Sequence, residues 1–223
     1  PRGRFHSRLA HEMFGYGKHI AGSRILVFGI TDIDDVFVSK LLGSSALGFY
    51  SFAYKLSNLP ATNITRLVNQ VMFPAFSKMQ EDREVLRDVY LRTTRYVSLL
   101  TIPASLCIMA FASDFIHGFY GDKWAPSIAP IQLLGIYGLA RSIAANMGNV
   151  FKASGKPQWL TTIAAVRLSV MAALLYPATR YYGIVGVSVL SAAVAVVDFF
   201  VSMALTHRIV RHSSAAFLVM LSP

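Results

Sequence analysis

Residues 31–80 read TDIDDVFVSKLLGSSALGFYSFAYKLSNLPATNITRLVNQVMFPAFSKMQ. Three acids, Asp32, Asp34 and Asp35, open an apolar run, a glycine and serine turn follows at 43–48, and a long helical pattern over about 47–77 carries Lys55 and Arg66. Charges inside segments long enough to cross a bilayer are costly and mark functional positions. We therefore interpret this stretch as the first helical hairpin of a membrane transport lobe.

The second half of this hairpin carries a polar stripe. Its members follow one another at spacings of three or four, which places them on one helical face; they are Lys55, Asn58, Thr62, Arg66 and either Asn69 or Gln70. A polar stripe on a membrane-spanning helix predicts an aqueous cavity on that side.

The composition of the whole chain agrees with a membrane protein. Of its 223 residues 54% are hydrophobic and 14% charged, whereas a soluble domain is about 25% charged. The net charge of +10 lies between apolar segments, which is how membrane proteins set their topology, so nucleic-acid binding is not expected. A single cysteine, Cys107, excludes an intrachain disulfide and a cysteine-based metal site.

Working outward from the hairpin, apolar segments predict an all-α integral membrane protein, a bundle of six transmembrane helices. The expected spans are 19–42, 47–77, 96–112, 130–151, 160–177 and 184–205. Residues 1–18 form a basic cytoplasmic lead-in, 19–208 the transmembrane lobe, and 209–223 a linker with the start of a further apolar segment. Residues 78–95 are densely charged and predict a solvated helical connector. Because both ends look cut, we expect a fragment of a longer protein.

The loops give an orientation. With a cytoplasmic N-terminus, the outer side holds only Lys40, at the outer end of the first span, and Lys123 and Arg180 in the loops, and every other Lys or Arg outside the spans lies on the inner side. This distribution follows the positive-inside rule.

Charges within the later spans have two interpretations. Arg141 lies near the middle of the fourth span, Arg167 in the fifth and Asp198 in the sixth. Such groups either line a pathway or pair with one another to fix helix packing. We favour a pathway for Arg66 and Arg141, although Arg66 could instead pair with Asp34 or Asp35. For Arg24 and Asp198, near span ends, snorkelling or structural pairing is at least as good an explanation.

Four motifs carry a family resemblance. They are DDVFVSKLLGSSALGFYSFAYKLSNLP (34–60), FPAFSKMQ (73–80), YGDKW (120–124) and ASGKP (153–157). Through them, residues 12–208 resemble bacterial polysaccharide flippases, the O-antigen and exopolysaccharide exporters of the MOP superfamily. Ser39 departs from the glycine that the family often has there.

The resemblance implies two six-helix lobes around a central cavity, with this chain as one lobe, the C-terminal half. It implies transfer of an undecaprenyl-pyrophosphate-linked oligosaccharide across the bacterial inner membrane. The implied partners are this substrate, membrane lipid, the missing N-terminal lobe and the polysaccharide polymerase machinery. Cations would then hold the phosphates, namely Lys55, Arg66, Arg141 and Arg167, and Asn58, Thr62 and Asn69 would bind sugar hydroxyls. Asp34, Asp35 or Asp198 would bind a coupling proton or sodium ion; no other cofactor and no metal is expected.

Other classes of protein remain as alternatives. A cation-coupled multidrug exporter of the same superfamily would need an acidic or aromatic cavity. A membrane enzyme such as a polysaccharide polymerase would need a large outer loop, and a scaffold would not need charged spans. The sequence has no nucleotide-binding, paired-histidine or nucleophile-elbow motif, so we do not expect an enzyme.

The predicted topology is tested by single-cysteine accessibility in whole cells. We expect cysteines placed at Arg4, at Arg208 and within 78–95 to be protected from an impermeant reagent added outside, and one at Lys123 to be labelled. Labelling of residues 78–95 from outside would contradict the orientation.

Overall fold

The computed structural model describes residues 33–78 and 83–210, together with 17, 18, 20 and 29. Residues 33–42 are helical and are followed by α2 (Ser44–Lys78), α3 (Arg83–Ala110) and α4 (Ala112–Phe115). A π-helix η1 (Ile116–Tyr120) and a 3-10 helix η2 (Asp122–Ser127) lead to α5 (Ile128–Ala153) and α6 (Gln158–Val210). The described part of the chain contains no strand, which confirms the all-α prediction.

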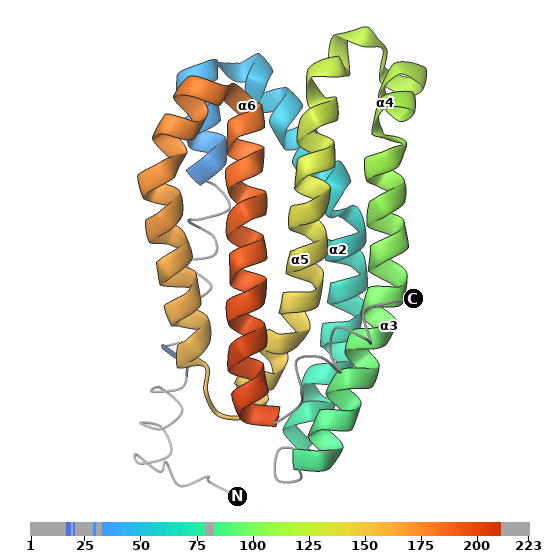
Figure 1. Cartoon of the computed structure of the whole chain (residues 1–223), viewed down its shortest axis with the longest axis vertical. Coiled ribbons are helices and arrows are strands. Elements are labelled where there is room, and N and C mark those ends of the chain that lie inside the picture. Colours follow the sequence, from blue (N-terminus) through green and yellow to red (C-terminus); the bar gives the residue numbers. More distant parts are fainter. Residues whose placement is uncertain (1–16, 19, 21–28, 30–32, 79–82, 211–223) are drawn as a thin grey trace, which may run out of the picture.

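The long helices run up and down one axis (Figure 1). α2 descends in this view, α3 ascends, α5 descends, and α6 ascends and returns. Gly183 reverses α6, because its φ of 60° and ψ of −148° break the helix and this conformation is open to glycine alone. α6 is therefore a hairpin of two limbs, 158–182 and 184–210, as expected from the break between the predicted spans 160–177 and 184–205.

The helix boundaries agree with the sequence except at α3. The predicted connector 78–95 and third span 96–112 form one helix from Arg83 to Ala110. No glycine or proline interrupts residues 83–102, so the charged part continues the apolar part as its solvated end. Residues 1–16, 19, 21–28, 30–32, 79–82 and 211–223 lie outside the described residues; with them lie Arg24, Asp32, most of the lead-in and most of the C-terminal segment.

α5 is the central helix of the lobe and contacts α2, α3 and α6. One half of it packs into a core with α2, η1 and both limbs of α6, formed by Tyr50, Ile116, Ile131, Leu134, Tyr137, Met171, Leu175 and Val187. Its other half packs against α3 through Leu86, Tyr90, Ile143, Met147, Val150 and Phe151. α5 therefore joins the two cores and positions every neighbouring helix.

Polar contacts and a glycine bring α2 and α5 together. A Cβ on Gly138 would lie 2.9 Å from the carbonyl oxygen of Ser57. The Ser57 hydroxyl donates to the carbonyl of Ile131 at 2.7 Å. On the other side of α5, the Asn146 side chain donates to the Thr94 hydroxyl of α3 at 2.6 Å. Small residues and interhelical hydrogen bonds are the usual means of joining helices in a membrane.

The outside of the lobe is suited to lipid. Large apolar side chains are exposed on α3 and on both limbs of α6, among them Leu99, Leu106, Val166, Val170, Leu174, Val189, Val197 and Phe200. Two helices in the described part are long and apolar enough to cross a bilayer, Asp122–Ala153 and Gln158–Arg208. Glu84–Ala110 and Ala112–Tyr120, which meet at 62°, make a third if they form one span.

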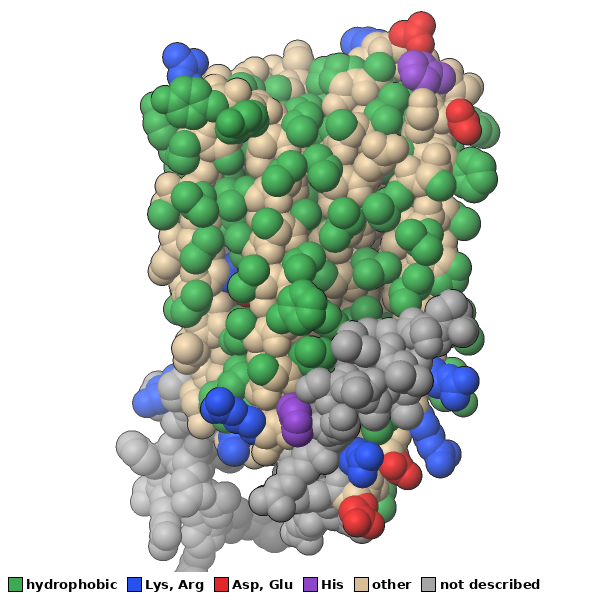
Figure 2. Space-filling view, in the orientation of Figure 1, with side chains coloured by type: hydrophobic (Ala, Val, Ile, Leu, Met, Phe, Trp, Pro, Cys, Tyr) green, Lys and Arg blue, Asp and Glu red, His purple; other side chains and the backbone are tan. Residues whose placement is uncertain are grey.

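Charged side chains gather at the two ends of the molecule. Figure 2 shows a long wall of hydrophobic and neutral atoms, with Lys and Arg concentrated at the lower end. α3 begins at that end and α5 ends there (Figure 1), so it carries Arg87, Arg92, Arg95, Lys152 and Lys156. This arrangement is the one expected for helices anchored at both faces of a bilayer.

The close approach at Gly138 predicts a stability effect in the full-length protein. We expect Gly138→Ala to lower the free energy of unfolding by about 1–3 kcal/mol, because the added methyl group meets the backbone of α2. Membrane abundance and the melting temperature should fall with it. Gly48→Ala is the matched control, since a Cβ there meets nothing within 4 Å. Equal behaviour of the two variants in thermal unfolding of the detergent-solubilised protein would contradict this account.

Candidate functional site

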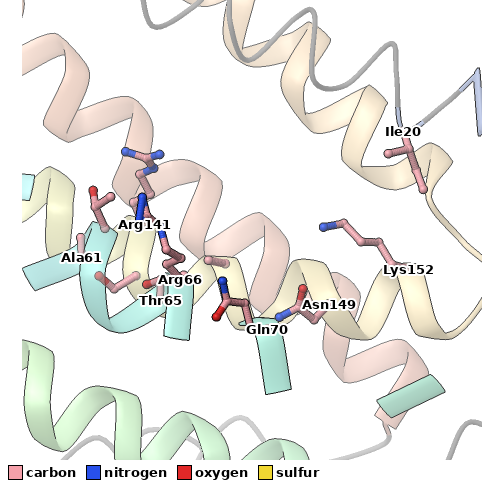
Figure 3. Close-up of a pocket in the computed structure, with 11 residues that line it drawn as sticks. Ile20, Ala61, Thr65, Arg66, Gln70, Arg141, Asn149 and Lys152 are labelled. Atoms are coloured by element: carbon pink, nitrogen blue, oxygen red, sulfur yellow. The ribbon is translucent and has the colours of Figure 1, made fainter. Parts of the chain in front are cut away.

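A pocket of about 610 Å³ lies between α2 and α5. The described residues that line it are Ile20, Ala61, Thr62, Thr65, Arg66, Gln70, Arg141, Ser142, Ala145, Asn149 and Lys152. Figure 3 shows the Arg66 and Gln70 side chains coming from α2 and those of Arg141, Asn149 and Lys152 from α5. Three members of the predicted polar stripe of α2, Thr62, Arg66 and Gln70, therefore line one wall of this pocket.

The second wall comes from a face of α5 that the sequence analysis identified only through Arg141. Arg141, Ala145, Asn149 and Lys152 follow at spacings of four, four and three, so they share one side of the helix. That spacing was visible in the sequence, but Lys152 was interpreted as part of an inner loop. α5 ends at Ala153, which makes Lys152 a residue of its last turn.

The pocket is cationic and rich in hydrogen-bond donors. Three of its described lining residues are cations, Arg66, Arg141 and Lys152, and none is a carboxylate. Amides and hydroxyls complete the lining, and the buried Thr65 hydroxyl has no hydrogen-bond partner among the described residues. Arginine forks and a lysine ammonium are the groups that bind phosphate and carboxylate anions, so the site fits an anionic ligand that also offers hydroxyl groups.

Among the described acids of the first hairpin, Asp34 and Asp35 are far from Arg66. Tyr50 donates to Asp34 at 2.9 Å and Ser51 to Asp35 at 3.3 Å. Arg66 lies sixteen residues beyond Tyr50 on α2, which at the rise of an α-helix is about 24 Å. The alternative that Arg66 forms an ion pair with Asp34 or Asp35 is therefore wrong. Arg66 is exposed in the wall of the pocket instead.

Arg141 and Arg167 lie on two sides of a pair of tyrosines. The phenol oxygens of Tyr54 and Tyr137 are 3.2 Å apart. Arg141 donates to Tyr54 at 3.5 Å, and Arg167 donates to Tyr137 at 3.0 Å. Both guanidinium groups also approach the Tyr137 ring, at 6.0 Å for Arg141 and 5.5 Å for Arg167.

Arg167 is an ion-paired residue in this structure. Its Nη1 lies 3.7 Å from Oδ2 of Asp198 on the other limb of α6, and both side chains are about one-fifth exposed. Asp198 thus forms an ion pair, and structural pairing was one of its predicted roles beside snorkelling and the binding of a coupling ion. Arg167 is not among the described residues of the pocket wall.

The remaining predicted site residues of α2 are not among the described residues that line the pocket. Lys55 is exposed on α2, on the same stripe as Thr62 and Arg66, and outside the pocket lining. Asn58 is buried against α5 and donates to the carbonyl of Tyr54 at 2.9 Å. Asn69 belongs to α2, but its side chain lies outside the described part of the chain. Within the described residues no cluster of metal-ligating side chains occurs.

Comparison with known proteins gives the family. Residues 1–129 match the family described as polysaccharide biosynthesis protein. Because this match covers more than half of the 223 residues, the chain belongs to that family. No solved structure matches the chain significantly.

Three relatives illustrate the similarity. Teichuronic acid biosynthesis protein TuaB from Bacillus subtilis (strain 168) is 25% identical over 213 residues, covering 96% of this chain and 44% of the relative. Lipopolysaccharide biosynthesis protein WzxC from Escherichia coli (strain K12) is 28% identical over 63% of this chain and 29% of the relative. An uncharacterized membrane protein in the cps region of Klebsiella pneumoniae is 29% identical over 74% of this chain and 34% of the relative.

The chain spans less than half the length of these relatives. The chain is thus a member of the polysaccharide biosynthesis protein family whose described part contains helices long and apolar enough to cross a membrane.

The Arg167–Asp198 pair predicts a compensation experiment. We expect Asp198→Ala to lower the stability of the full-length protein by about 1–3 kcal/mol, because Arg167 is left largely buried without its acid; a fully buried pair would cost more. The double variant Arg167→Met, Asp198→Leu should recover most of the loss. Asp88→Ala, which removes an exposed acid of α3, is the control. Thermal unfolding measures all three variants, and a double variant less stable than Asp198→Ala would refute structural pairing.

Proposed function

We propose that this chain is one lobe, the C-terminal half, of a transporter that moves a lipid-linked oligosaccharide across the bacterial inner membrane for surface polysaccharide assembly. It acts as a flippase rather than an enzyme. The observation that carries the proposal is the cationic pocket between α2 and α5, in a lipid-facing helical lobe of a polysaccharide biosynthesis family.

Six spans are consistent with the observed helices. The helix at 33–42 would end the first span, α2 would be the second, α3 the third and α5 the fourth, and the two limbs of α6 would be the fifth and sixth. At 1.5 Å per residue, α3 and each limb of α6 are about 37–42 Å long, enough for a hydrocarbon core of about 30 Å.

The pocket lies in the half of the lobe that the charge distribution assigns to the cytoplasmic side. Arg141 is about 20 Å along α5 from Ile128, and Lys152 about 36 Å. Arg66 is about 33 Å along α2 from Ser44. The pocket thus runs from mid-height toward the end that is rich in Lys and Arg, which the positive-inside rule makes cytoplasmic. A substrate made in the cytoplasmic leaflet would meet the pocket there.

The lining suits an undecaprenyl-pyrophosphate head that carries sugars. Arg66 and Arg141 would hold phosphate oxygens as planar forks, and Lys152 as a point charge. Thr62 and the nearby amides would bind sugar hydroxyls. Lys55, exposed further up the same face of α2, would face the cavity shared with the N-terminal lobe, where a cation is less costly than in lipid.

The acidic side chains are the candidates for binding a coupling ion, and an acidic cavity would also favour the rival multidrug exporter. Asp34 is 5% exposed and its Oδ1 has no hydrogen-bond partner among the described residues, so we retain it, with Asp35, as a candidate for a coupling proton or sodium ion. The rival multidrug exporter needs an acidic or aromatic cavity for cationic drugs. The three cations of the pocket favour the flippase instead.

Arg66 provides the direct test. In the full-length protein we expect Arg66→Ala to reduce surface polysaccharide at least tenfold with normal membrane abundance, because the phosphate contact is lost. Arg66→Lys should retain part of the export, since the charge remains and the fork is lost. Arg95→Ala, an exposed cation of α3 outside the pocket, is the control. Immunoblots of membranes beside polysaccharide assays make the measurement. Wild-type export by an abundant Arg66→Ala variant would remove Arg66 from the site.

A further inference from the structure

The two arginines beside the tyrosine pair are held very differently. Arg167 donates a 3.0 Å hydrogen bond to Tyr137 and forms an ion pair with Asp198. Its guanidinium group also lies over the face of the Tyr137 ring. Arg141 is exposed, its bond to Tyr54 is 3.5 Å long, and its distance from the same ring is greater. Hydrogen bonds of this length are weak, so Arg141 can leave its resting contact at little cost while Arg167 cannot.

The tyrosine pair connects these two sites. A guanidinium group only donates hydrogen bonds, so each phenol oxygen accepts from its arginine. One phenol proton then forms the 3.2 Å bond between Tyr54 and Tyr137. Tyr137 is 4% exposed in the core of the lobe, and Tyr54 packs against its ring at 5.7 Å between centroids. The pair is therefore a rigid polar element, anchored at one end by Arg167 and Asp198.

We propose that Tyr54 and Tyr137 form a positioning unit that holds Arg141 at the pocket ready to bind the diphosphate, while Arg167 anchors the unit and does not bind ligand. The inference rests on the proposed function and deepens it. A side chain already held near its bound position loses less rotamer freedom on binding. The long bond from Arg141 to Tyr54 allows the guanidinium to turn to the anion, and the short bond from Arg167 keeps the unit in place.

The unit also explains how two like charges are accommodated near one buried ring. Each guanidinium gains a phenol oxygen and the negative face of Tyr137. Only one of them has a carboxylate within ion-pairing distance among the described residues, namely Arg167 with Asp198. Among the described residues no carboxylate pairs with Arg141, so its positive charge can pair with an incoming anion.

The test measures ligand binding by the full-length protein in nanodiscs. Geranylgeranyl pyrophosphate is the probe, and geranylgeranyl monophosphate the comparison. We expect Tyr54→Phe to weaken diphosphate binding about 3- to 10-fold, the range for the net loss of one ordinary hydrogen bond, and to reduce the preference for the diphosphate. Tyr90→Phe is the matched control, a buried tyrosine of α3 far from the unit.

A double-mutant cycle separates positioning from stability. In an Arg141→Ala background, Tyr54→Phe should cause no further loss of binding, because the group that it positions is absent. Tyr137→Phe, which retains the ring, repeats the cycle if Tyr54→Phe does not accumulate. Losses that add in the double variant would overturn the inference and leave the proposed function intact. Wild-type protein that binds neither probe would overturn both.

Discussion

The contact between α2 and α5 at Gly138 is the constraint on which the site depends. A glycine here lets the backbone of α5 reach the Ser57 carbonyl, and the Ser57 hydroxyl then bonds to Ile131. The same approach brings Tyr54 to Tyr137 and leaves the pocket between the two helices further along. Apolar burial distinguishes little between a neighbouring helix and lipid, so close packing and polar contacts must hold this interface.

The cations inside the lobe fall into two groups, which differ in how far their side chains are removed from water. Arg167, removed from solvent between the limbs of α6, has an acid at 3.7 Å. Arg66 and Arg141 are exposed in the pocket and have no ion pair among the described residues; hydration reduces the cost of such a charge. An arginine that is ion-paired to a neighbouring helix stabilises helix packing, whereas an arginine exposed in the pocket can bind an anion. The position of each arginine relative to the pocket therefore decides its role.

Much of the architecture follows from one-dimensional patterns. The length of the apolar segments predicts the helices, and the breaks between the predicted spans predict the reversals between α5 and α6 and at Gly183. The spacing of Thr62 and Arg66 predicts the polar wall of α2. α3 was divided wrongly, because a change from charged to apolar composition looks like a boundary between elements. The backbone needs no break there, since a helix can pass from water into lipid without losing a hydrogen bond.

The sequence by itself determined the membrane class, the family motifs, the helical faces and the cations that interrupt them. Only the tertiary structure decided which of those cations share a cavity. Periodicity places Arg141, Asn149 and Lys152 on one face of α5, but it does not say which helix that face meets. Arg141 and Arg167 look alike as lone charges in apolar spans, and they differ because Asp198 comes from a limb that Gly183 folds back beside Arg167. Such contacts join residues far apart in the chain, so helix packing alone creates them.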